Sequence, residues 1–92
     1  MLVTMHPLPE DCAYRYAFTT PDLPIHEALF ERTTRNLIFL EKQFGGNPPR
    51  RCVVEPPYYS DEAFARYIAP FPDTINRKLT NFLTLIITEI DK

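Results

Sequence analysis

The stretch from residue 22 to residue 44, DLPIHEALFERTTRNLIFLEKQF, decides the fold that the sequence predicts. Side chains that can face a core recur in it at intervals of three and four residues, the spacing of one face of an α-helix. Asp22 can cap such a helix, Pro24 suits its first turn, and the pair Gly45-Gly46 is typical of a helix end. We therefore expect one long helix over Asp22–Phe44. Its buried stripe comprises Ile25, Leu29, Thr33, Leu37, Leu40 and Phe44.

Strands are expected on both sides of this helix in the sequence. Residues Cys12–Thr19 alternate between two sets of side chains, with the aromatic ones on one face, which is the period of a β-strand. Leu2–Met5 is expected to be a short partner strand. Beyond the helix, Arg51–Glu55 contains the run Cys-Val-Val and stops at Pro56-Pro57, because proline cannot donate to a sheet.

The rest of the chain is expected to be helical. Ser60-Asp61-Glu62 is a typical capping sequence for a short helix over Asp61–Ala69. From Asp73 to Asp91, apolar side chains recur at helical spacing, although the many Thr and Ile residues between positions 82 and 90 also suit a strand. We prefer the helix, because the stripe continues without a breaker, and keep the strand as the alternative.

These elements predict one α+β domain spanning residues 1–92. The ten prolines fall in pairs that mark the ends of short elements, and 92 residues are the length of a single domain. The expected order is strand, long helix, strand, short helix, long helix. We therefore expect a small two- or three-stranded sheet with a long helix, a short helix and a C-terminal helix packed on one face.

The charge balance argues against a general nucleic-acid-binding protein. Ten lysine and arginine residues against twelve acidic ones give a net charge of −2, whereas nucleic-acid-binding proteins usually carry a strongly basic face. Basic residues do gather between positions 32 and 51, so nucleic-acid binding through them is kept as a weaker alternative. They are Arg32, Arg35, Lys42, Arg50 and Arg51.

Neither a secretory leader nor a membrane span is expected. Pro7 and Pro9 interrupt the first apolar run, and polar residues interrupt the last one. We therefore expect a cytoplasmic location, in which Cys12 and Cys52 are reduced. A bond between these two cysteines remains open.

The sequence contains no recognised catalytic, metal-binding or cofactor-binding motif. Its two glycines lie in one turn, which leaves little from which to build a phosphate-binding loop. His6, Cys12, His26 and Cys52 are zinc-ligand types, but each lies alone in its own element, so no metal or cofactor is expected. A small enzyme, or a subunit of one, with a pocket between the sheet and the helices is the second interpretation.

A short proline-rich segment offers one further alternative. Pro56-Pro57-Tyr58-Tyr59 matches the Pro-Pro-x-Tyr pattern that WW domains bind in an extended conformation. The pattern is short and arises often by chance, and a proline-rich turn with packing tyrosines is expected between a strand and a helix. We favour the turn and keep the ligand as an alternative.

The sequence favours a small non-enzymatic interaction or regulatory domain of the adaptor, inhibitor or immunity type. The last helix is apolar on more than one side, so we expect it to form a homodimer or to bind another protein. Its partner-binding residues are expected to be Leu79, Phe82, Leu83 and Ile86. Arg35, Arg50 and Arg51 are the expected polar contacts, because arginine pairs well with carboxylates and phosphates.

Overall fold

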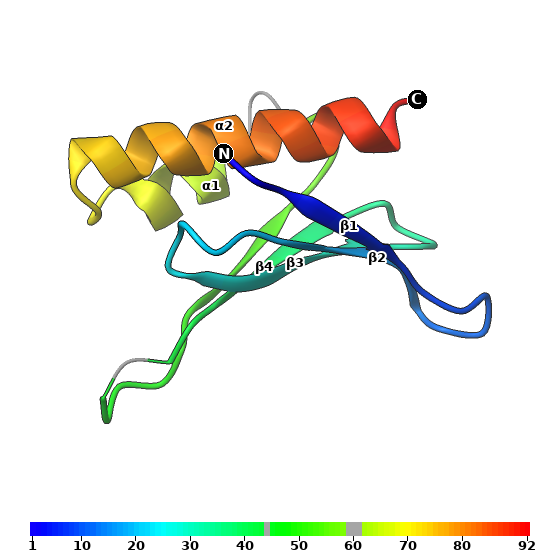
Figure 1. The fold of residues 1–92 in the computed structure, drawn as a ribbon, viewed down its shortest axis with the longest axis horizontal. Coiled ribbons are helices and arrows are strands. Elements are labelled where there is room, and N and C mark those ends of the chain that lie inside the picture. Colours follow the sequence, from blue (N-terminus) through cyan, green and yellow to red (C-terminus); the bar gives the residue numbers. More distant parts are fainter. Residues whose placement is uncertain (44, 59–61) are drawn as a thin grey trace.

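The computed structural model describes residues 1–43, 45–58 and 62–92. These residues form a five-stranded antiparallel sheet and two helices, and both helices lie on the same face of the sheet (Figure 1). The strands occupy the sheet in their chain order, so each pairs with its neighbour in sequence. The elements are β1 (Thr4–Pro7), β2 (Tyr14–Thr19), β3 (Ile25–Glu31), β4 (Leu37–Glu41), β5 (Arg51–Val54), α1 (Glu62–Ile68) and α2 (Asp73–Ile90).

The helix predicted over residues 22–44 is wrong, because its described part forms β3, a turn and β4. In the turn, the Arg35 N–H donates to the Glu31 carbonyl, and the Asn36 N–H donates to the Thr34 hydroxyl. Arg35 has a φ of +62°, a left-handed conformation that no regular helix contains. Polar residues that bond to nearby backbone thus reverse the chain where the helix was expected to continue.

The helical spacing of apolar residues between positions 22 and 44 arises by coincidence from two consecutive strands. A bulge between Ile25 and Glu27 breaks the alternation of β3, and β4 begins with four consecutive apolar residues. The alternation that identifies a strand is therefore hidden in both. Gly45, with a φ of +58°, belongs to the β4–β5 connection rather than to a helix cap. Phe44, the expected last residue of the helix, lies outside the described residues.

The predicted fold class is corrected accordingly. Over the described residues the sheet has five strands rather than two or three, and two helices are present rather than three. The remaining predicted elements are confirmed with shifted ends, and the strand alternative for residues 82–90 is wrong, because they lie in α2. The expected partner strand does pair with β2, but over Thr4–Pro7. Ser60 and Asp61, the predicted start of the short helix, lie outside the described residues.

The core lies between the sheet and the two helices. Phe39 of β4 is fully buried, and its ring centre lies 5.4 Å from that of Phe64 on α1 and 5.9 Å from that of Phe82 on α2. One strand residue therefore contacts both helices, and aromatic burial of this kind is a main source of stability. The strand side chains of this core are Phe18, Ile25, Ala28, Phe30, Leu37, Phe39, Cys52 and Val54.

Candidate functional site

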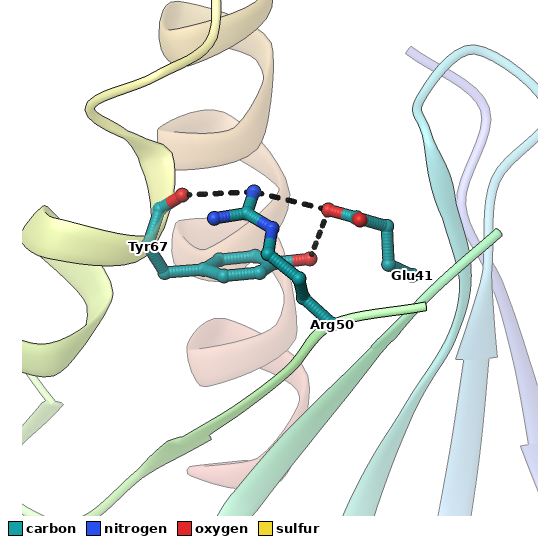
Figure 2. Close-up of polar contacts among 3 residues, drawn as sticks. All are labelled: Glu41, Arg50 and Tyr67. Atoms are coloured by element: carbon teal, nitrogen blue, oxygen red, sulfur yellow. Dashed lines mark hydrogen bonds and ion pairs between the residues drawn. The ribbon is translucent and has the colours of Figure 1, made fainter. Parts of the chain in front are cut away.

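A cluster of three side chains joins the β4–β5 connection to α1 (Figure 2). The Arg50 guanidinium lies 3.1 Å from the Glu41 carboxylate and donates to the Tyr67 carbonyl at 3.3 Å. Its centre lies 4.6 Å from the centroid of the Tyr67 ring and 5.3 Å from that of Phe71. The Tyr67 hydroxyl donates to the same carboxylate oxygen at 3.2 Å. Arg50 is therefore bound on one side by charge and on the other by aromatic faces.

The electrostatics of this cluster favour a structural role. Burial, and then the neighbouring Glu41 carboxylate, raise the pKa of the Tyr67 hydroxyl above its ordinary value of 10.0. The phenol consequently remains protonated near neutral pH, where it serves as a hydrogen-bond donor and not as a general base. Arg50 was predicted to contact a partner, but this guanidinium already binds its own chain.

The other two predicted arginines lie elsewhere. Arg35 is in the β3–β4 turn, with its guanidinium 5.1 Å from the centroid of the Phe30 ring, and its carbonyl accepts a hydrogen bond from Tyr58. Burial raises the pKa of Tyr58. Arg51 is exposed and begins β5, where the next residue, Cys52, points into the core. Since strand side chains alternate, Arg51 points to the sheet face opposite the helices. The structure therefore does not bring the three arginines into one site.

The four predicted partner-binding residues of α2 lie inside the chain's own core. Leu79, Phe82, Leu83 and Ile86 are all buried in the cluster that α2 forms with the sheet. A five-stranded sheet offers more apolar surface than the two or three strands predicted, so it covers most of the helix. On α2, the large apolar side chain that is exposed is Leu85, at 42%.

Exposed apolar side chains gather between β1 and α2. Among the described residues, the large hydrophobic side chains with the greatest exposure are Met1 (47%), Leu2 (68%), Met5 (38%) and Leu85 (42%). All but Leu2 line one groove of about 360 Å³, which we call the β1 groove. Its full lining is Met1, Val3, Met5, Phe18, Leu85, Thr88 and Glu89.

The β1 groove runs beside an open edge of the sheet, because β1 pairs on one side only, with β2. The Leu8 N–H donates to the Arg15 carbonyl at 3.0 Å. Bonded pairs alternate along an antiparallel ladder, so His6 and Thr4 bond to β2, while the N–H and C=O groups of Met5 point outward. An edge of this kind can accept a further strand.

The β1 groove was not predicted from the sequence, although each of the two segments that line it could be recognised separately. The sequence predicts a strand over Leu2–Met5, and Leu85 is an apolar residue outside the buried stripe of the last helix. No pattern in the sequence indicates that the two segments lie side by side.

Candidate metal ligands do not converge. Within residues 1–43, 45–58 and 62–92, no group of three or more His, Cys, Asp or Glu side chains is placed to hold a metal ion. His6 instead shares a hydrogen bond of 2.8 Å with the Thr19 hydroxyl. No disulfide bond joins Cys12 to Cys52. Of the basic residues weighed for nucleic-acid binding, Arg32 donates to the carbonyls of Cys12 and Pro9.

The Pro-Pro-x-Tyr segment is only partly described. Tyr58 is buried, at 7% exposure, and its hydroxyl is bound to the β3–β4 turn. Tyr59, which would be the recognised tyrosine of such a ligand, lies outside the described residues. The part that is described packs as a turn against the core.

Comparisons with known protein families, curated proteins and solved structures found no match for this chain. None of the helices in the described part of the chain combines the length and the apolar character that a membrane crossing requires.

Proposed function

We propose that this chain is a protein-interaction domain that binds an extended segment of another protein along β1. The observation that carries the proposal is the gathering of exposed large hydrophobic residues beside an open sheet edge. Scattered apolar residues are normal on a protein surface, whereas a continuous apolar patch is typical of a binding site. A regulatory role in the cytoplasm remains part of this proposal.

The chemistry of the edge defines the expected partner. An added strand would pair with the outward backbone groups of Val3 and Met5, and the pairing would end at Pro7, which has no N–H. Successive side chains of the added strand point to opposite faces. Those on the helix side would enter the β1 groove beside Leu85, and those on the other side would lie near His6. The partner segment should therefore alternate apolar and polar residues.

A displayed library of random peptides tests the proposal, because its members sample many partner sequences at once. Panning on the unmodified chain should enrich peptides with apolar residues at every second position. These peptides should bind Leu85→Glu at least about tenfold more weakly, because the substitution places a charge in the β1 groove. Thr84→Glu is the matched control, since Thr84 is the neighbouring exposed residue of α2 and does not line the β1 groove. Binding to this variant should be unchanged.

A second pair of variants separates strand addition from simple apolar adhesion. Met5→Ala removes the side chain but keeps the outward N–H, whereas Met5→Pro removes both. Proline is tolerated on an edge strand where the N–H faces solvent, so both variants should fold. The selected peptides should bind Met5→Pro several-fold more weakly than Met5→Ala. Peptides with apolar residues at spacings of three and four, or equal binding to both variants, would contradict strand addition.

A further inference from the structure

The sheet face opposite the helices, which we call the open face, carries an apolar centre. Antiparallel sheets that meet water on one side usually alternate apolar and polar residues, yet β4 is apolar on both sides. No helix of the described chain covers this face (Figure 1). Its apolar residues are Ala17 and Ile38, which neighbouring side chains already bury, and Leu29, Leu40 and Val53, which are half-buried. A strand that is apolar on both sides is typical of a sheet with both faces covered.

We propose that a second copy of this chain covers the open face, with a two-fold axis that runs parallel to β4 and midway between the two sheets. The inference goes beyond the proposed function, because it uses a different surface and leaves the β1 edge and the β1 groove free. It assigns the expected homodimer to the sheet instead of to α2.

The register of the strands makes the apolar row self-complementary. Leu29 of β3, Ile38 of β4 and Val53 of β5 are cross-strand neighbours in one row. Rotation about β4 exchanges the positions of β3 and β5, so each Leu29 would face Val53 of the other copy. Ile38 points toward the axis and would face its own equivalent. Aliphatic side chains would thus meet aliphatic side chains across β3, β4 and β5, with strands nearly aligned as in β-sandwiches.

Charged residues in the next row would form opposite-charge pairs under the same rotation. Glu27, Leu40 and Arg51 are cross-strand neighbours on β3, β4 and β5. Within one chain, Glu27 and Arg51 lie two strand spacings apart, about 9–10 Å, and no ion pair joins either residue to another described residue. Rotation about β4 places each Glu27 opposite Arg51 of the other copy. The row of Glu27 and Arg51 therefore carries its own complementary charge, which favours a copy of this chain as the occupant. The row on the other side of Ile38 does not add to this preference, because the same rotation brings Glu31 near Glu55 of the other copy.

The solution mass tests the inference through charge reversal. The unmodified chain should sediment at twice 10.8 kDa at high concentration and dissociate on dilution. Glu27→Arg and Arg51→Glu should each weaken the dimer at least about tenfold at low salt, because each places like charges face to face at two symmetric positions. The double variant restores opposite charges and should dimerise within about threefold of the unmodified chain.

A mixture of the two single variants provides a further test. One copy then carries arginine at both positions and the other carries glutamate at both, so the pair is complementary. Mass spectrometry under native conditions should show heterodimers in excess of either homodimer. Leu85→Glu should leave the dimer unchanged, and circular dichroism should show that every variant is folded.

Three results would overturn the inference. The first is a chain that remains a monomer up to about millimolar concentration. The second is a double variant as weak as the single ones, and the third is a dimer that Leu85→Glu dissociates. Because peptide binding at the β1 groove is measured with different variants, failure of the dimer leaves that proposal testable, and the reverse also holds.

Discussion

The two faces of the sheet carry alternate side chains of the same strands, but the helices cover only one of them. On the covered face, Phe18, Ala28 and Phe39 form a cross-strand row that meets the helices. On the open face, Ala17, Leu29 and Ile38 form the adjacent row. The covered row contains large aromatic rings, whereas the open row is aliphatic and its flank is charged.

The difference shows how one strand can serve two purposes. Aromatic rings fill the irregular space beneath helices and make specific edge-to-face contacts there. An aliphatic surface that is flanked by acidic and basic residues suits packing against another sheet. The covered face therefore contributes most to folding, and the open face is the surface through which we propose that the chain associates.

The largest effect is expected from truncation at the covered face. Phe39→Ala should lower the free energy of unfolding by about 3–5 kcal/mol, because it removes a ring that contacts both helices and leaves a cavity. Val53→Ala, at a half-buried residue of the open face, should cost no more than about 2 kcal/mol in dilute protein, because it removes less apolar surface from a less enclosed site. Urea unfolding measures both values, and equal losses would contradict the contrast between the faces.

The neighbouring arginines Arg50 and Arg51 allow the same comparison with a charged residue. Arg50→Ala should lower the free energy of unfolding by about 1–2 kcal/mol, because Glu41 loses one of its two hydrogen-bond donors and the Tyr67 carbonyl loses the guanidinium. Arg51→Ala should remain within about 0.5 kcal/mol of the unmodified chain in dilute protein. Thermal unfolding of the two variants side by side checks the difference, and a larger loss for Arg51→Ala would show that the roles of the two are reversed.

A smaller, pH-dependent effect is expected at Tyr67. Its pKa is raised in the folded chain, so the unfolded chain loses the proton first as the pH rises through 10.0. Stability is therefore fully present below that pH and is lost progressively above it, up to the folded pKa. Tyr67→Phe should lower stability by about 1 kcal/mol at neutral pH but flatten the alkaline decline. An unchanged alkaline slope, measured by urea unfolding between pH 8 and 11, would disprove the assignment.

The smallest effect on folding is expected at Leu40, the apolar residue in the charged row of the open face. Leu40→Thr should change the free energy of unfolding by less than about 1 kcal/mol in dilute protein, because the side chain is only half-buried. At high concentration the same variant should dimerise several-fold more weakly, because Leu40 of β4 points toward the proposed axis. Sedimentation and urea unfolding on one preparation separate the two effects, and an unaffected dimer would contradict the placement of the axis.

Elements whose local pattern agrees with their tertiary role were predictable from the sequence. The stripe from residue 73 onward identified α2, and alternation identified β2. Residues 22–44 were not predictable in this way, because β4 is apolar on both sides and the bulge in β3 removes its alternation. The evident sequence cue was the run Thr33-Thr34-Arg35-Asn36, which contains poor helix formers that favour turns.

The candidate sites were less predictable than the fold, since they depend on which segments meet. The exposure of Arg51 agrees with the sequence prediction, but the binding of Arg50 to Glu41 and Tyr67 required β4, β5 and α1 to be placed together. The stripe on α2 was correctly recognised as apolar but was assigned to a partner, because the predicted sheet was too small to cover it. Because too few strands were expected, core residues of α2 were predicted to lie on the surface.

The order of the strands also determines how the chain can assemble as it is synthesised. Each new strand finds the strand that it pairs with already made, so the sheet can grow by short-range hairpins without waiting for distant residues. The helix that covers its aromatic face, α2, follows all five strands in the sequence. A nascent chain that has completed β5 therefore displays two apolar faces at once, and such surfaces invite aggregation. Once α2 is complete it covers one of these faces, and the risk of aggregation through that face ends.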